Sequence, residues 1–228
     1  MAALRDWRPL ALAGLVLAAF LPSVNTPLLV VNELTIAGNW LRACHEGPAG
    51  WITWPHNYYR PLVLPLYGLL AVGLHGWPIH AVLLLLHLGM TWWVYRVGCR
   101  LLGDMTAAAV GAAWFGVIWM KYENVVWAGG LESVAGSCLA ALALSAYASD
   151  RPGRRWLAVF LFGVMLLVYQ VALLLPLVWL WLDIRAGRRL RAAPGLSVAG
   201  ILLVLGWIWL AGRIAPTGSP FAHTLLGP

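Results

Sequence analysis

Few polar side chains interrupt this apolar chain, so each one is a candidate for chemistry. Glu33 follows the first apolar run, beside Asn32, in the stretch PLLVVNELTIAGNW. A carboxylate among apolar residues is costly unless it is paired or put to use. One use is that of a general base, which takes a proton from a hydroxyl group. The alternative is a solvated loop glutamate that caps the next helix.

Arg60 marks the start of a second apolar segment, in HNYYRPLVLPLYGLL. The proline that follows it suits the first turn of a helix, and the neighbouring Tyr59 suits the headgroup layer of a membrane. A guanidinium group at that level can form paired hydrogen bonds to a phosphate. The sequence therefore predicts a phosphate contact at Arg60, provided that this residue lies on the outer face.

Two further acids lie in or near apolar segments. Glu123 is close to Lys121, and a surface ion pair worth little is the plain interpretation. If a helix starts near Asn124, Glu132 lies roughly 12 Å along it, at about 1.5 Å per residue. A charge at that depth in a bilayer costs about 2.5–3.5 kcal/mol. Glu132 is therefore expected to be protonated, paired or in contact with an aqueous cavity.

His80 and His87 are seven residues apart and so share one face of a helix. A haem held by two histidines is one alternative, but such a site needs matching ligands on other helices. Hydrogen bonding between helices is the preferred interpretation. The three cysteines form no CxxC pair, so neither a disulfide framework nor a zinc site is indicated. No nucleotide-binding or hydrolase motif occurs, and no metal ligands are assigned.

The elements that must position these residues are membrane helices. Hydrophobic residues make up 62% of the chain and charged residues only 10%, whereas a soluble domain is about one quarter charged. Long apolar runs recur along the chain, which indicates a polytopic membrane protein. The net charge of +7 comes from arginines between the apolar runs, as the positive-inside rule requires. That pattern excludes a basic nucleic-acid-binding face.

Arginine placement decides how the chain crosses the membrane. The best arrangement leaves residues 61–76 on the outer face and lets 156–182 cross twice, with a turn at Tyr169-Gln170. It places eleven of the 15 basic residues inside, whereas the rival arrangement places seven there. The eleven are Arg5, Arg8, Arg96, Arg100, Arg151, Arg154, Arg155, Arg185, Arg188, Arg189 and Arg191.

The expected fold is therefore all-α, a polytopic membrane helix bundle that forms one transmembrane domain over residues 1–228. About seven transmembrane helices are expected, with the N-terminus in the cytoplasm. They span residues 9–24, 79–99, 105–120, 125–148, 156–168, 171–184 and 195–212. Residues 25–78 form an outer loop that contains a re-entrant or interfacial helix over 61–76. The first span is interpreted as an uncleaved helix, because no clear cleavage site follows it.

Several landmarks in this order resemble one family. The stretch YYRPLVLPLYGLLAVGLHGWPIHAVLLLLHLGMTWWVYRVGCRLLGD is similar to the early part of GT-C superfamily membrane glycosyltransferases. It is closest to the branch that contains the protein O-mannosyltransferases with tetratricopeptide repeats. The matching residues are Tyr59, Arg60, Pro61, Leu62, His80, His87, Val94, Tyr95, Arg96 and Gly103.

The resemblance continues to about residue 212. In FGVIWMKYENVVW the matches are Phe115, Glu123, Val125 and Trp127. The family's His-Pro and second His positions hold Ile118, Trp119 and Lys121. A family turn between two short spans falls at Tyr169-Gln170 and is followed by a matching Pro176. The family's later spans and soluble domain are not seen, which leaves a fragment, a minimal enzyme or a silent relative as alternatives.

The resemblance implies transfer of a sugar from a polyprenyl-phosphate donor to an acceptor at the extracytoplasmic face of a bacterial inner membrane. The family carries an acidic pair in the first outer loop, where this chain has Asn32-Glu33, so only Glu33 could be the base. Arg60 would bind the donor phosphate with help from Lys121. The supporting residues would be Asn32, Tyr59, His80, His87, Glu123 and Glu132. A divalent cation is compatible with this site, although no ligand cluster requires one.

A non-enzymatic subunit of a larger membrane complex is the alternative from another class. Asn32 in place of an acid and the missing His-Pro favour it. The 15 tryptophans also favour it, since aromatic residues are enriched at interfaces. Bound lipid phosphate beside Arg60 would favour the glycosyltransferase. Partner chains that purify with this chain would favour the non-enzymatic subunit.

Overall fold

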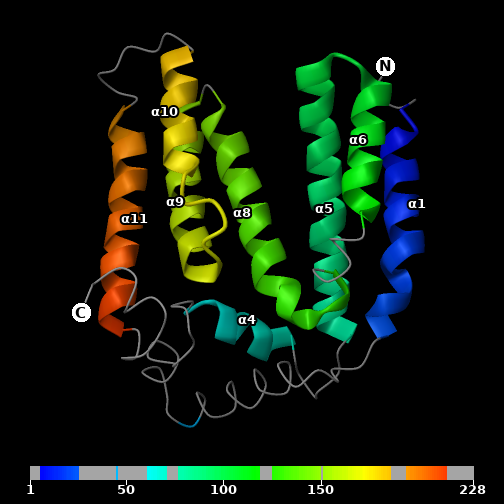
Figure 1. The fold of residues 1–228 in the computed structure, drawn as a ribbon, viewed down its shortest axis with the longest axis horizontal. Coiled ribbons are helices and arrows are strands. Elements are labelled where there is room, and N and C mark those ends of the chain that lie inside the picture. Colours follow the sequence, from blue (N-terminus) through cyan, green and yellow to red (C-terminus); the bar gives the residue numbers. More distant parts are fainter. Residues whose placement is uncertain are drawn as a thin grey trace. The chain divides into compact units, whose positions relative to one another are not determined.

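The computed structural model describes residues 6–25, 45, 61–70, 77–118, 125–149, 151–185 and 194–214. All regular secondary structure in these residues is helical (Figure 1), which confirms the predicted all-α class for this part of the chain. The α-helices are α1 (Arg8–Phe20), α4 (Val63–Leu70), α5 (Trp77–Leu102), α6 (Met105–Val117), α8 (Leu131–Tyr147), α9 (Pro152–Val168), α10 (Leu175–Arg185) and α11 (Pro194–Ile214). Two short 3₁₀ helices cover Leu21–Asn25 and Ala128–Gly130.

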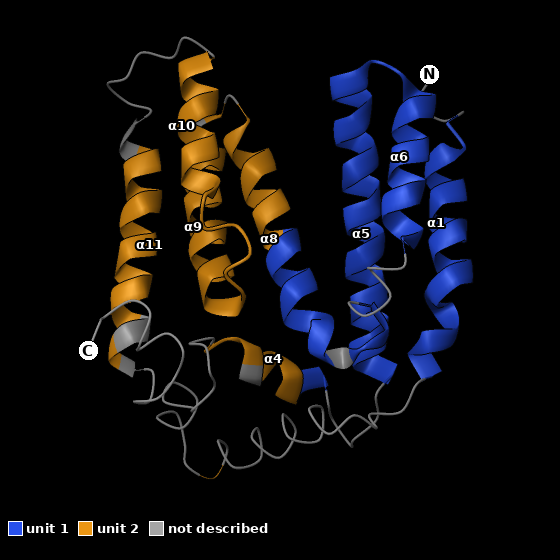
Figure 2. Ribbon diagram, viewed as in Figure 1, with its two compact units in different colours: residues 1–37, 69–138 blue, residues 38–68, 139–228 orange. Residues whose placement is uncertain are grey.

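The chain forms two compact units (Figure 2). Unit 1 contains residues 1–37 and 69–138, and unit 2 contains residues 38–68 and 139–228. The boundary at residue 138 falls within α8. Each unit has its own packed interior, and the single transmembrane domain expected over 1–228 stays a prediction.

Unit 1 is built on α1, α5 and α6, which lie side by side (Figure 1). A tight turn joins α5 to α6, and Gly103 within it has a φ of 68°, a left-handed conformation that glycine adopts without strain. The Asp104 side chain then caps α6, because its carboxylate accepts hydrogen bonds from the backbone N–H groups of Thr106 and Ala107, at 2.7 and 3.2 Å. This turn makes α5 and α6 antiparallel.

Small residues let the three helices of unit 1 approach closely. A Cβ atom on Gly116 of α6 would lie 2.9 Å from Cγ2 of Val16 on α1 and 3.1 Å from Cγ2 of Thr91 on α5. A Cβ atom on Gly98 of α5 would lie 3.0 Å from the Cβ atom of Ala108. Contacts of this kind are typical of helices that associate within a membrane.

Unit 2 packs α9, α10, α11 and the C-terminal part of α8 around Trp179, which is fully buried. Phe162 meets the Trp179 ring edge-on, with ring centroids 5.4 Å apart. Gly200 of α11 lies against Pro176 and Trp179 of α10, where an added Cβ would come within 2.9 Å of Pro176 Cγ. The aromatic core therefore depends on a glycine at the contact between α10 and α11.

The helix break predicted at Tyr169-Gln170 is confirmed. α9 ends at Val168, and Tyr169 has an extended backbone (φ −163°, ψ 128°). The Gln170 side-chain amide donates to the Leu166 carbonyl at 2.9 Å, which satisfies one of the unpaired carbonyls at the end of α9. Pro176 lies in the first turn of α10, where its missing N–H is not needed.

Most of the other predicted helices begin and end within a few residues of the observed ones. The predicted 61–76 segment is helical over Val63–Leu70, and residues 71–76 lie outside the described residues. The predicted 125–148 helix is continuous only from Leu131. Here Trp127 departs from the helix and its ring covers Gly129, where an added Cβ would lie 2.5 Å from that ring.

By length and composition, Arg8–Asn25 and Trp77–Leu102 can each cross a membrane. In the most apolar 18-residue stretch of each segment, only 22% of the residues of Arg8–Asn25 and 33% of those of Trp77–Leu102 are buried. Large apolar side chains such as Leu10, Leu101 and Trp114 are exposed. Three shorter apolar helices cover Met105–Val117, Leu131–Tyr147 and Leu196–Leu210. Seven spans stay a prediction.

Candidate functional site

Most of the predicted site residues lie outside the described residues. This holds for the predicted base Glu33 and the predicted phosphate ligands Arg60 and Lys121. It also holds for Asn32, Tyr59 and Glu123. The described candidates are His80, His87 and Glu132, and all three belong to unit 1.

His87 connects α5 and α6 through a hydrogen bond. Its Nε2 atom lies 2.8 Å from the Gly116 carbonyl oxygen, so the ring nitrogen donates to α6 when it carries the proton. The ring of Phe20 meets it edge-on at 5.5 Å, and Phe115 stacks on it at 5.9 Å. The preferred interpretation, hydrogen bonding between helices, is thereby confirmed for His87. Iron ligation through Nε2 would break this contact, which argues against the haem alternative.

His80 is buried one heptad before His87, as the shared helix face predicts. It contributes to the packed interior of unit 1, together with Ile79 and Leu83. Both histidines lie on the buried face of α5, and their supporting role at the site stays a prediction.

The position predicted for Glu132 is corrected. It lies in the first turn of α8, not two turns into a helix. The physical reason is the break at Trp127 and the 3₁₀ turn Ala128–Gly130, which delay the start of the helix. A carboxylate in a first turn interacts favourably with the helix dipole, and the expectation that Glu132 is protonated, paired or in contact with an aqueous cavity stays a prediction.

A buried polar cluster in unit 2 was not predicted. The Tyr147 hydroxyl donates to Oδ2 of Asp183 at 2.5 Å and lies 3.3 Å from the Ser197 hydroxyl. Asp183 is 1% exposed, and its other oxygen lies 3.9 Å from Nη1 of Arg155. The signal in the sequence was an aspartate inside the apolar run LPLVWLWLDIR. A buried carboxylate needs such partners, because an unpaired charge there would be strongly destabilising.

The cluster joins four helix ends within unit 2. Tyr147 ends α8, Arg155 lies in the first turn of α9, Asp183 is near the end of α10, and Ser197 is near the start of α11. The Arg155 guanidinium also lies over the Tyr147 ring, 5.6 Å from its centroid. Because these side chains form hydrogen bonds and an ion pair with one another, the cluster stabilises the packing of the four helices. It does not offer a free base.

A second polar cluster lies at the start of α1 in unit 1. Tyr95 of α5 donates its hydroxyl to Oδ2 of Asp6 at 2.5 Å, and the Arg8 guanidinium lies 3.3 Å from Oδ1. Arg8 also donates to the Thr106 hydroxyl of α6 at 3.3 Å. The Tyr95 hydrogen bond, followed by those of Arg8, lowers the pKa of Asp6 below its ordinary value.

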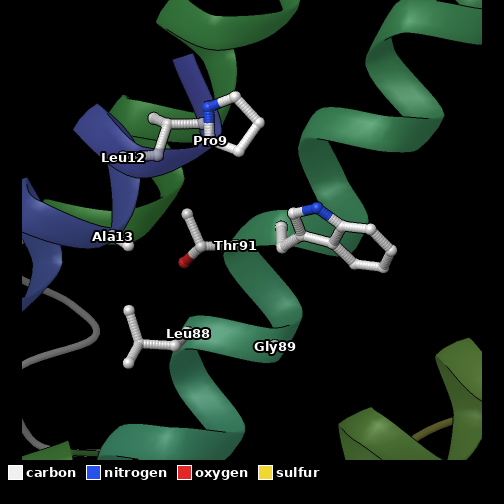
Figure 3. A pocket seen from close by; sticks show the side chains of 7 residues that line it. Pro9, Leu12, Ala13, Leu88, Gly89 and Thr91 are labelled. Atoms are coloured by element: carbon white, nitrogen blue, oxygen red, sulfur yellow. The ribbon is translucent and has the colours of Figure 1, made fainter. Parts of the chain in front are cut away.

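Two cavities flank α1 within unit 1. The first, of about 300 Å³, lies between α1 and α5 (Figure 3). Its lining residues are Pro9, Leu12, Ala13, Leu88, Gly89, Thr91 and Trp92. The Thr91 hydroxyl is already used, because it donates to the His87 carbonyl at 2.9 Å. This cavity is therefore suited to an apolar guest and offers no acid or base.

The second cavity is a groove of about 460 Å³ between α1 and α6. It differs from the first in having Arg8 and Thr106 at one end.

In the described part of the chain, no group of three His, Cys, Asp or Glu residues could hold a metal ion. No family model, curated protein or solved structure matches the chain.

Proposed function

We propose that the chain is a polytopic membrane protein of the GT-C type that transfers a sugar from a polyprenyl-phosphate donor at the extracytoplasmic face. The observation that carries this proposal is the break between α9 and α10. It falls at Tyr169-Gln170, with Pro176 after it, where the resemblance requires a turn between two short spans. A single continuous helix over 156–182 would have counted against it.

The exposed apolar surface supports the membrane part of the proposal. Monomeric soluble proteins rarely expose large contiguous apolar patches. Here Leu69 on α4, Leu85 on α5 and Phe160 on α9 are each at least 66% exposed. Since both long apolar helices are mostly unburied, they differ from the core helix of a soluble protein. Lipid would cover these side chains.

Arginine positions within each unit support the proposed sidedness. In unit 1, the hydrogen bond from Arg8 to Thr106 brings together the start of α1 and the start of α6, next to the end of α5 with Arg100. In unit 2, the cluster around Asp183 gathers the helix ends that carry Arg155 and Arg185. Arg213 lies at the opposite end of α11. The positive-inside rule makes the arginine-rich ends cytoplasmic.

The proposed reaction follows from that sidedness. Arg60 and Lys121 hold the donor phosphate while its isoprenoid tail remains in lipid. Glu33 takes the proton of the acceptor hydroxyl as the acceptor oxygen bonds to the anomeric carbon. The bond from that carbon to the phosphate oxygen breaks, and polyprenyl phosphate leaves. Glu123, with Glu132 as the alternative, orients the acceptor, a divalent cation or Arg60. The 61–76 segment forms one wall of the groove that holds the donor lipid.

The test is transfer from a radiolabelled polyprenyl-phosphate sugar by the purified full chain in liposomes. Glu33→Gln removes the base and is expected to lower turnover about 10²–10⁴-fold. Arg60→Ala is expected to raise the KM for the donor, whereas Arg42→Ala, another arginine of the predicted outer loop, serves as the matched control. Equal turnover of wild type and both site variants would refute the assigned roles.

The same preparation tests the alternative of a non-enzymatic subunit. That alternative is favoured by Asn32 in place of an acid and by the missing His-Pro. It predicts no transfer by wild type and stoichiometric partner chains after mild purification. Sugar transfer by the isolated chain would exclude it.

A further inference from the structure

We propose that the groove between α1 and α6 binds an anionic phospholipid, with Arg8 at the phosphate and the acyl chain along the apolar wall. The inference relies on the membrane assignment made above but not on sugar transfer. It concerns the end of unit 1 that carries Arg8, Arg96 and Arg100.

The shape of the groove fits an acyl chain. The α1 side is formed by Trp7, Arg8, Ala11, Leu12 and Leu15, and the α6 side by Thr106, Ala109, Val110 and Ala113. Ala109 and Ala113 are one helical turn apart, so their small side chains leave a continuous hollow. From Arg8 to Leu15 the groove runs about 10 Å along α1, at about 1.5 Å per residue.

The polar end of the groove fits a phosphate. An arginine side chain has five N–H donors, and the contacts of its Nη atoms with Asp6 and Thr106 occupy two of them. The remaining donors can bind phosphate oxygens, and the exposed Thr106 hydroxyl can donate as well. A charged headgroup would therefore be recognised by both helices.

The charge around this end also favours an anion. Asp6 offsets part of the Arg8 charge, but one of its oxygens is engaged by Tyr95 of α5. Arg96 and Arg100 follow on α5, and Asp104 caps α6. The described side chains at this end thus carry three positive and two negative charges.

The cavity between α1 and α5 supplies an internal comparison. Its lining contains no charged side chain (Figure 3), although it borders the same helix α1 through Pro9, Leu12 and Ala13. A lipid chain bound in this cavity would make no contact that depends on the charge of its headgroup. Headgroup selection is therefore expected only at the groove that contains Arg8.

The experiment is native mass spectrometry of the purified full chain with phosphatidylglycerol or phosphatidylcholine of identical acyl chains. Wild type is expected to bind phosphatidylglycerol roughly tenfold more tightly, which corresponds to about 1.4 kcal/mol, because the choline cation of phosphatidylcholine offsets the phosphate charge that Arg8 binds. Arg8→Gln is expected to remove this preference. Arg100→Gln is the matched control, because Arg100 is exposed at the same end but does not line the groove.

A second pair of variants tests the groove itself and is independent of Arg8. Val110→Phe fills the groove from an exposed position and is expected to reduce phosphatidylglycerol binding. Gly89→Leu fills the other cavity, where an added Cβ meets nothing within 4 Å, and is expected to leave headgroup preference unchanged. Should Arg8→Gln fail to fold, this pair decides the question.

Three results would overturn the inference. They are equal binding of the two lipids by wild type, equal losses in Arg8→Gln and Arg100→Gln, and unchanged binding by Val110→Phe. Thermal stabilisation by inorganic phosphate alone, equal to that by the lipid, would likewise show a soluble-anion site and refute lipid binding. Absence of a lipid preference in wild type, with sugar transfer intact, refutes this inference alone. Absent sugar transfer with lipid preference intact refutes only the proposed function.

Discussion

Two tyrosine hydroxyls bind aspartates at helix ends, one in each unit. Tyr95 donates to Asp6 in unit 1, and Tyr147 donates to Asp183 in unit 2. In both cases an arginine lies beside the same carboxylate: Arg8 next to Asp6, and Arg155 next to Asp183. These aspartates therefore join helices that are distant in sequence.

The Asp6 contact predicts a specific dependence on pH. Its pKa is lowered in the folded chain below the ordinary value of 3.8. A lowered pKa means that the carboxylate contributes stability above its unfolded pKa and loses it as the pH falls through the folded value. The contribution of the Asp6 carboxylate to stability is thus complete at neutral pH and is lost as the pH falls from 3.8 through the lower pKa of the folded chain.

The measurement is an NMR titration of Asp6 in wild type and in Tyr95→Phe. Because Tyr95 is the main cause of the shift, its removal is expected to raise the Asp6 pKa toward 3.8, with part of the lowering retained through Arg8. Arg100→Gln should leave the titration unchanged, since none of the hydrogen bonds to Asp6 involves that side chain. Identical curves for wild type and Tyr95→Phe would disprove the contact.

At the scale of the elements, helix ends and glycines determine the packing. The Gln170 side chain ends α9, and Pro176 starts α10, so one apolar segment becomes two helices. Gly116 and Gly200 then set how closely the helices meet in units 1 and 2. Not every glycine has this role: an added Cβ on Gly206 of α11 meets nothing within 4 Å.

This contrast predicts opposite effects for two substitutions on α11. Gly200→Ala is expected to destabilise the protein by about 1–3 kcal/mol, because overpacking displaces Pro176 and Trp179. Gly206→Ala is the matched control and is expected to stabilise by about 0.5–1 kcal/mol through helix propensity. Reversible unfolding in mixed micelles, followed by circular dichroism, measures both. Similar effects of the two changes would contradict the observed α10–α11 contact.

At the scale of the whole molecule, the central question is which helix ends face the cytoplasm. The proposed topology places the ends that carry Arg100 and Arg155 inside and the end that carries Arg213 outside. The predicted site at Glu33 and Arg60 is then on the outer face. The lipid groove at Arg8 is then on the inner face.

Cysteine labelling tests this sidedness. In a chain with its three cysteines replaced by serine, Arg213→Cys is expected to react with an impermeant maleimide in intact cells. Arg100→Cys is expected to react only after the cells are permeabilised. Both arginines are exposed, so a difference in labelling reflects the side of the membrane. Labelling of both positions in intact cells would refute the topology and, with it, the outer-face site.

The sequence by itself determined the helical class and most helix positions. Apolar runs and proline placement are local signals, which is why the break at Tyr169-Gln170 and the start of α6 near residue 105 could be predicted. The buried face shared by His80 and His87 follows from the same periodicity.

Only the tertiary structure decided which polar groups meet. The partners of Asp183 are 36 residues away in Tyr147 and 28 residues away in Arg155, and no local pattern encodes such pairs. The delayed start of α8, which places Glu132 in a first turn, likewise depends on how Trp127 folds over Gly129. Periodicity gives the direction of each side chain from its own helix. Packing between helices decides what that side chain touches, because distant segments must share one interior.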